Sequence, residues 1–359
     1  MPAQSPRIYS TRCRPAALAS LAAWAMGAGS AAPAAPGALT EVTGESAVLI
    51  GLEWSQLALG SLALGSAQIR STYRPNLPET IVYLEGKDFE FDYATGQLRR
   101  LNGSRIEDFR DNVLFGKVKF NHREFPGYGN QKHLVYVDYR SRDNWPWPPA
   151  PRATDRLPQL RSRLKQNEPI RLAAFGDSIT AGTDVSDPSL IYWNRWLQAL
   201  GRRHPGARLT GINASTNGDT VLHGLTRLTE KVTAARPNLV LIAFGMNDQN
   251  VGATPSARFE QGLLEAMDRV RTEAEAELIL VTPCFPNPQW RHTSGRMPEL
   301  VEIIRSVAER QHVACADTTA LWKPLLERKK PEDLLVENIN HPTDFGQWVY
   351  FQALERLGC

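Results

Sequence analysis

The chain has 359 residues, of which 42% are hydrophobic and 22% are charged, and this balance excludes a disordered or fibrous protein. Its formal net charge of +3 comes from three arginines within residues 1–35, where no acidic residue occurs. The remaining 38 basic residues balance the 38 acidic ones, so the composition gives no support for a basic nucleic-acid-binding surface. The length predicts about two domains.

Residues 1–35 have the organisation of a secretory signal peptide. Three arginines precede an apolar stretch, Ala16–Ala28, and small residues follow it. This stretch is shorter than the roughly 20 apolar residues of a transmembrane helix, which disfavours the alternative of an uncleaved anchor. We therefore expect an exported protein, periplasmic or extracellular, without a stable membrane anchor.

Residues 41–143 are typical of strands and turns. Short apolar or aromatic runs at Ala47–Leu52, Thr80–Leu84, Phe89–Tyr93 and Leu134–Tyr139 are separated by glycine-containing turns. No long stretch has helical periodicity. The segment is therefore predicted to be a small β-sandwich domain.

Residues 144–168 begin with a run of prolines and tryptophans, which forms neither a helix nor a central strand because proline lacks the backbone donor. We predict a stiff linker here. Trp145 and Trp147 either stack on a sugar or pack against one of the domains, and packing is the commoner use of such side chains. Trp290 is a third aromatic residue that we expect to be exposed.

Residues 169–359 alternate between apolar strands and amphipathic helices. The expected strands are Ile170–Phe175, Leu209–Ile212, Asn238–Phe244, Leu278–Thr282 and His312–Ala316, and the expected helices are Leu190–Gly201, Val221–Ala235, Ala257–Ala274 and Pro298–Gln311. This rhythm predicts an α/β fold with a doubly wound parallel sheet of five strands. Ligands bind beyond the carboxyl ends of the strands in such sheets.

The cysteines that follow the predicted signal peptide are Cys284, Cys315 and Cys359. Their odd number and wide spacing exclude a disulfide framework or a zinc ribbon. Cys284 and Cys315 each follow a predicted strand, which leaves open either a disulfide between strand ends or, as the commoner case, two buried thiols.

Four residues with distinctive chemistry follow predicted strands or lie near the end of the sequence: Ser178, Gly218, Asn247 and His341. A serine between a strand and a helix presents its backbone N–H where negative charge is stabilised. A glycine N–H and an asparagine amide at neighbouring strand ends can donate to the same oxyanion. Each also has a simpler role, namely a helix cap, a turn with positive φ and an Asx-turn respectively.

Together these residues resemble the ordered blocks of the SGNH (GDSL-type) hydrolase family: Gly-Asp-Ser, a glycine, Gly-x-Asn-Asp and Asp-x-x-His. The resemblance covers residues 169–359 and implies a flavodoxin-like sheet. It assigns Ser178 as the nucleophile and His341 as the base, with Ser178, Gly218 and Asn247 forming the oxyanion hole.

One position departs from the family pattern, because Asn338 stands three residues before His341 where the family usually has aspartate. An asparagine can fix the tautomer of the imidazole, but it offers no full charge. We therefore expect a Ser–His dyad oriented by Asn338 or by a backbone carbonyl. Glu337 and Asp344 are neighbouring carboxylates that can substitute.

The resemblance implies ester hydrolysis through an acyl-enzyme on Ser178, without a cofactor. The other histidines show no metal-ligand spacing, so no metal is expected. An exported hydrolase of this family with a β-domain in front of it resembles carbohydrate esterases. The expected substrate is therefore an acetylated carbohydrate or another small ester. The alternatives are a generalist short-chain esterase or lipase, and a carbohydrate-binding protein whose hydrolase domain has lost turnover.

Overall fold

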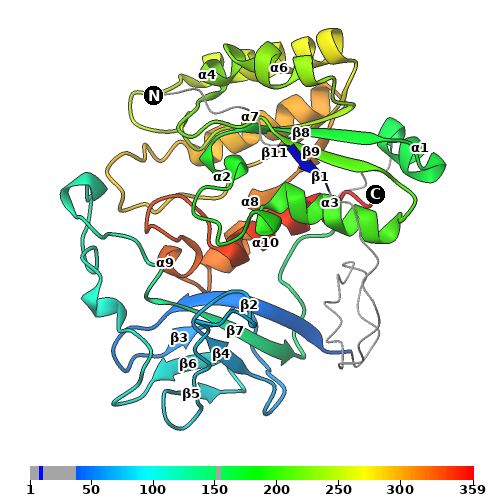
Figure 1. Ribbon diagram of the computed structural model, residues 1–359. Coiled ribbons are helices and arrows are strands. Elements are labelled where there is room, and N and C mark those ends of the chain that lie inside the picture. Colours follow the sequence, from blue (N-terminus) through cyan, green and yellow to red (C-terminus); the bar gives the residue numbers. More distant parts are fainter. Residues whose placement is uncertain (1–7, 11–37, 151–154) are drawn as a thin grey trace.

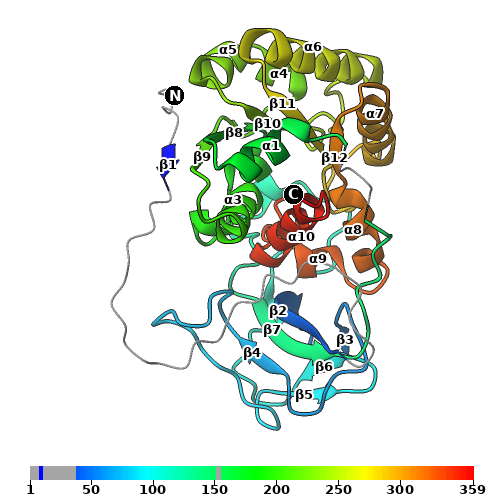
Figure 2. The same cartoon turned by 90° about the vertical axis from the view of Figure 1, so that its right-hand side faces the viewer.

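The computed structural model describes residues 8–10, 38–150 and 155–359. An all-β part, blue to cyan in Figure 1, lies against a larger α/β part, green to red. Figure 2 shows the same two parts from the side. Of the predicted signal peptide only Ile8–Ser10 is described, so that prediction lies largely outside the described residues.

The α/β part is built on one sheet with the order β1-β9-β8-β10-β11-β12. The strands are β1 (Ile8–Ser10), β8 (Ile170–Gly176), β9 (Leu209–Asn213), β10 (Leu239–Ala243), β11 (Glu277–Val281) and β12 (Ala314–Ala316). The last five are parallel, and β1 pairs antiparallel with β9 at the edge. The predicted doubly wound sheet of five parallel strands in flavodoxin-like order is therefore confirmed.

Helices cover both faces of this sheet (Figure 1). One face carries α4 (Val221–Leu225), α5 (Leu228–Lys231), α6 (Ser256–Ala274) and α7 (Met297–Arg310), and the other carries α1 (Pro158–Gln166), α3 (Tyr192–Arg203), α8 (Thr318–Leu326) and α10 (Asp344–Glu355). The helix predicted over Val221–Ala235 is wrong as a single unit. The helix ends after α4, where the Arg269 guanidinium donates to the Leu225 carbonyl (3.0 Å).

The predicted linker also needs a correction, because its second half forms α1. Leu160 and Leu164 of this helix belong to the buried core of the α/β part. The Glu277 carboxylate accepts from Leu160 N (2.8 Å) and so satisfies the first turn of the helix. Trp145 and Trp147 stack on each other at 4.6 Å and pack on the α/β core, so packing is the role observed.

Two antiparallel sheets of three strands each make up the all-β part. The first has the order β2 (Thr40–Val48), β7 (Leu134–Ser141), β4 (Gln68–Arg70), and the second β3 (Ser55–Gln56), β6 (Gln97–Arg100), β5 (Phe89–Asp92). One apolar cluster contains residues of both sheets, such as Val137 of β7 and Leu98 of β6. The strand predicted over Thr80–Leu84 does not form, since Val82 makes only an isolated bridge and much of the segment is exposed.

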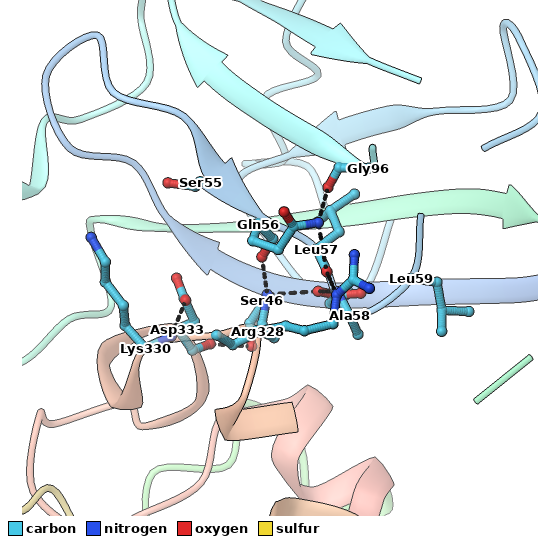
Figure 3. Close-up of polar contacts among 12 residues, drawn as sticks. Ser46, Ser55, Gln56, Leu57, Ala58, Leu59, Gly96, Arg328, Lys330 and Asp333 are labelled. Carbon is cyan, nitrogen blue, oxygen red and sulfur yellow. Dashed lines mark hydrogen bonds and ion pairs between the residues drawn. The ribbon is translucent and has the colours of Figure 1, made fainter. Parts of the chain in front are cut away.

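Cys284 and Cys315 are free thiols in this fold, and Cys284 is buried. Within the described ranges, no helix has the length and apolar character needed to cross a membrane. The two parts meet where β2 lies against α9 (Pro331–Leu334), a short helix between α8 and α10 (Figures 1 and 2). Figure 3 shows the polar contacts of this junction.

Candidate active site

Ser178 lies at the first position of α2 (Ser178–Ala181), immediately after β8 and Asp177. The Asp177 carboxylate caps this short helix by accepting from Ile179 N (3.0 Å), so the aspartate of Gly-Asp-Ser does cap the helix. Gly176 is required for this tight turn, because a Cβ there would meet the Ala243 carbonyl at 2.5 Å. Ser178 itself is left at the carboxyl edge of the sheet with its hydroxyl available to a partner.

That partner is His341, whose Nε2 lies 2.9 Å from Ser178 Oγ. The two residues are 163 positions apart and come from opposite ends of the α/β part. A neutral imidazole at this distance can take the proton from the hydroxyl. The structure thus brings together the serine and the histidine that the sequence analysis paired.

The second ring nitrogen of His341 contacts two carboxylates. Nδ1 lies 2.6 Å from Asp184 Oδ2 and 3.1 Å from Glu337 Oε2. Burial lowers the pKa of His341, but the hydrogen bonds and charges of Asp184 and Glu337 outweigh it and raise this pKa to about 9. In turn, the hydrogen bond to His341 holds the pKa of the Asp184 carboxyl below its usual range.

Asp184, Glu337 and His341 also form the one group of possible metal ligands in the described part of the chain. Their ligand atoms lie within 4.8 Å of one another. Both carboxylates lie at hydrogen-bonding distance from the same nitrogen of His341. This arrangement suits a shared Nδ1 proton, which a metal would have to displace. The cluster is therefore better described as an ion-paired imidazole.

The expectation that Asn338 orients the imidazole is wrong. Asn338 is buried, and its carbonyl accepts from the Asn130 amide (2.6 Å) while its own amide donates to Asn112 (3.3 Å). Asp344 does not reach the imidazole either, since it begins α10 and accepts from Ser186 N (3.1 Å). Of the carboxylates named from sequence, Glu337 is the one in contact with His341.

The analysis of the sequence missed Asp184, the carboxylate with the shortest contact to Nδ1. It lies six residues after Ser178, just past the end of α2, in a left-handed conformation (φ 64°). Its proximity to the serine block is a signal, but Asp187 shares that proximity and bonds Ser189 instead. Only the conformation of the turn separates the two aspartates.

Gly218 and Asn247 lie in neighbouring loops at the same sheet edge. Asn247 Nδ2 donates to the carbonyl of Asp219, the residue after Gly218 (2.9 Å). The loop after β9 is tied to the serine turn by Thr216 N, which donates to the Gly176 carbonyl (3.0 Å). Gly218 has φ 80° and open space around its Cα. The geometry thus gathers the predicted oxyanion-hole residues, and their role stays a prediction.

A loop of the all-β part brings aromatic side chains to this site. Burial, and then the charges of the nearby Glu337 and Asp184 carboxylates, raise the pKa of Tyr128. The Tyr128 ring contacts His122 at 5.1 Å, and His122 Nδ1 accepts from Trp290 Nε1 (3.0 Å). Trp290 is buried, which corrects the expectation that it is exposed.

Residues 174–349 match the GDSL-like lipase/acylhydrolase family. The chain is 38% identical over 181 residues to an arylesterase from Vibrio mimicus, covering 50% of this chain and 84% of that protein. It is 34% identical over 120 residues to esterase TesA from Pseudomonas aeruginosa, where the match spans 32% of this chain and 56% of the relative. Among solved structures, the acetylxylan esterase Axe2 from Geobacillus stearothermophilus shares 21% identity, covering 53% of this chain and 94% of that one, with a TM-score of 0.45.

The chain thus spans just over half the length of TesA and most of the length of the arylesterase. Both relatives are esterases by name, and both the family match and the predicted motif blocks lie in the α/β part. The resemblance inferred from Ser178, Gly218, Asn247 and His341 is confirmed at the level of the family. This chain belongs to the GDSL-like lipase/acylhydrolase family, a family of carboxylic ester hydrolases.

Proposed function

We propose that the protein is an exported serine esterase that removes O-acetyl or other short acyl groups from carbohydrate through an acyl-enzyme on Ser178. The observation that carries this proposal is the continuous chain of contacts from Ser178 Oγ through His341 to Asp184 and Glu337. A serine hydroxyl, an imidazole and a carboxylate in this order form the machinery of acyl transfer.

In the first half-reaction His341 Nε2 takes the proton of Ser178 while Oγ attacks the ester carbonyl. The tetrahedral intermediate collapses when His341 gives the proton to the ester oxygen of the leaving group, which departs as the free alcohol. Water then repeats the sequence on the acyl-enzyme and releases the carboxylic acid. Asp184 and Glu337 stabilise the imidazolium that exists in each intermediate.

The oxyanion of each intermediate needs donors, and the backbone N–H groups of Ser178 and Gly218 with the Asn247 amide are the candidates. Asn247 uses one of its two amide hydrogens to bond Asp219 O, which fixes the direction of the other. A single such donor contributes about 3–4 kcal/mol to lowering the barrier.

A carbohydrate substrate is supported by three half-buried rings in contact with one another: Tyr128, near the two carboxylates, then His122 and His292. Rings of this kind can stack on the apolar faces of sugars. Export rests on the composition of residues 1–35, and the N-terminal sequence of protein recovered from outside the cytoplasm tests it. The alternative of a carbohydrate-binding protein without turnover rests on the absence of a carboxylate at position 338. Asp184 and Glu337 contact His341 and supply that negative charge, so this alternative has no support from the site.

A second candidate is a generalist esterase or lipase acting on apolar esters. It is favoured by exposed apolar side chains on the loop that leads to Phe120, which contacts Trp290: Val113 is 42% exposed, Phe115 39% and Val118 72%. Such a patch suits a lipid surface or an acyl chain better than it suits a sugar.

The test compares the full chain with its Ser178→Ala variant on p-nitrophenyl acetate, p-nitrophenyl palmitate and acetylated xylan. The acetyl substrates should be turned over by the wild type, and Ser178→Ala should lower kcat about 10⁴-fold or more. Ser162→Ala removes an exposed hydroxyl on α1 and serves as the control. Faster turnover of the palmitate favours the second candidate, and equal turnover by wild type and Ser178→Ala refutes the serine mechanism.

A further inference from the structure

The segment that carries His341 connects α8 with α10, and we call residues 327–343 the histidine loop. Within it, Val336 N donates to the His341 carbonyl (2.9 Å) and Thr343 N to the Leu334 carbonyl (2.8 Å). These bonds close a turn that contains Glu337, Asn338 and His341. They do not connect the turn to the sheet. A bond from the α/β part does so, since Asn287 N in the loop after β11 donates to the Ile339 carbonyl (2.7 Å), and three further anchors come from the all-β part.

The first anchor of the histidine loop is β2 of the all-β part. Ser46 Oγ donates to the Asp333 carbonyl (2.6 Å), and Val48 N donates to the Asp333 carboxylate (2.8 Å). The other oxygen of that carboxylate accepts from Lys330 N (2.9 Å) and closes the first turn of α9 (Figure 3). One aspartate therefore joins the histidine loop to a strand nearly 300 residues earlier.

The second anchor is an ion pair between Lys329 Nζ and Glu45 Oε1 (2.6 Å) in which neither side chain is exposed. Glu45 also accepts from Ala58 N (2.8 Å) and from the Tyr139 hydroxyl (2.6 Å). Beside it, Arg328 Nε donates to the Leu57 carbonyl (3.1 Å), as Figure 3 shows. The start of the histidine loop is thus fastened to the interior of the all-β part.

The third anchor, Asn130, reaches the turn itself. Asn130 N donates to the Val336 carbonyl (2.6 Å), and its amide donates to the Leu335 carbonyl (2.9 Å) and to Asn338 Oδ1 (2.6 Å). Its own carbonyl accepts from Asn112 Nδ2 (3.1 Å), and the side chain is fully buried. Asn130 therefore bonds to residues on both sides of Glu337, and one of them, Asn338, lies three positions before His341.

From these contacts we infer that Asn130, supported by Asn112, is a positioning residue for the catalytic histidine, so that the all-β part completes the active site rather than acting as a separate module. The inference rests on the proposed function, because it presumes that His341 is the base. Asn130 touches neither the substrate nor the imidazole. It acts by fixing the turn on which His341 and Glu337 are placed relative to Ser178.

The same contacts explain why asparagine occupies position 338. Its carbonyl accepts from Asn130 while its amide donates to Asn112, and an ionised aspartate could make only the first of these bonds. An ionised aspartate would place an unpaired charge among buried acceptors. Asn338 also has φ 59°, in the left-handed region that asparagine tolerates better than most residues. Position 338 therefore serves the junction, and Asp184 and Glu337 provide the carboxylates.

The test uses full-length Asn130→Ala and Asn112→Ala, with Ser141→Ala as the matched control. Ser141 is a buried residue of the all-β part that bonds Gly60 O (2.6 Å) and Asp143 N (2.9 Å), remote in sequence from the histidine loop. Three quantities are measured: kcat and KM on p-nitrophenyl acetate, the pKa of His341 by ring ¹⁵N NMR, and the thermal unfolding midpoint.

Asn130→Ala should lower kcat about 10- to 100-fold with KM nearly unchanged, because misplacing a catalytic group by about 1 Å can cost ~10²-fold. Its His341 pKa should fall, since the imidazole loses its fixed place between Asp184 and Glu337. Asn112→Ala should change both quantities in the same direction by less, and it replaces Asn130→Ala as the decisive variant if the latter does not fold. Ser141→Ala should affect only the unfolding midpoint.

A wild-type kcat and His341 pKa in both folded asparagine variants would overturn the inference, as would equal losses in Ser141→Ala. Failure of the proposed function looks different, because the wild type would then show no turnover that Ser178→Ala removes. The NMR titration still reports on the position of His341 in that case.

Discussion

The two sides of the contact between Ser178 and His341 are built in different ways. Ser178, Gly218 and Asn247 each lie within five residues of the carboxyl end of β8, β9 or β10, and bonds inside the α/β part join their loops, from Thr216 to Gly176 and from Asn247 to Asp219. His341 lies in a loop that follows no strand of the sheet. Besides the bond from Asn287 N to the Ile339 carbonyl, that loop is held by residues of the all-β part 202 to 297 positions earlier in the chain. Sheet topology alone therefore places the serine side, while the histidine side depends on a second part of the molecule.

The largest expected effect comes from removing the charges at His341 Nδ1. Asp184→Asn should lower kcat/KM about 10-fold, because Glu337 remains at the same nitrogen. The double variant Asp184→Asn with Glu337→Gln should lose roughly 10³- to 10⁴-fold, since no carboxylate then stabilises the imidazolium. Steady-state kinetics on p-nitrophenyl acetate measure both.

Asp187→Asn is the control for this pair, because Asp187 lies on the same loop and bonds Ser189 and Arg74 rather than His341. If kcat/KM falls no further in the double variant than in Asp184→Asn, Glu337 does not contribute to the reaction. Unchanged activity in both variants would mean that the carboxylates are not part of the reaction.

The same contrast explains what the sequence could reveal. The five parallel strands follow from local apolar patterns, and the places of Ser178, Gly218 and Asn247 from the rule that ligands bind at the carboxyl edge. The flavodoxin-like order of the strands is implied by the resemblance to the family. Asp184 could not be separated from Asp187 without the conformation of the turn. The role of Asn338 depends on Asn130 and Asn112, which no local pattern connects with it.

Short or exposed elements escaped the sequence analysis for a related reason. Helix α1 lies in the predicted linker, and its Leu160 and Leu164 become significant only once the sheet they cover is in place. The reverse error occurred at Thr80–Leu84, where an apolar run suggested a buried strand but Ile81 and Leu84 are 44% and 52% exposed. Burial is a property of the assembled fold, and a short run of residues does not encode it.

A second prediction tests the junction as a source of stability. Lys329→Met should destabilise the protein by about 3–5 kcal/mol, because it leaves the Glu45 carboxylate buried without its counter-charge. Denaturant unfolding measures this change, and Lys323→Met, at an exposed lysine on α8, is the control. The double variant Glu45→Met with Lys329→Met should recover only part of the loss, since it buries no isolated charge but leaves Ala58 N and the Tyr139 hydroxyl without their acceptor. Equal stability of Lys329→Met and Lys323→Met would show that the ion pair adds nothing.

The smallest expected effect is a shift in the pH profile. His341 acts as a base only when neutral, and its pKa is raised to about 9, so kcat/KM should fall as the pH drops below that value. Glu337→Gln removes one of the two negative charges at Nδ1, which lowers the pKa of His341 and moves the profile to lower pH. Glu309→Gln removes the same charge at a distant exposed site and should leave the profile unchanged. A profile that does not move in Glu337→Gln would mean that Asp184 alone sets the pKa of His341. In that case the one carboxylate that the reaction needs would come from the loop that follows Ser178, and not from the loop that carries His341.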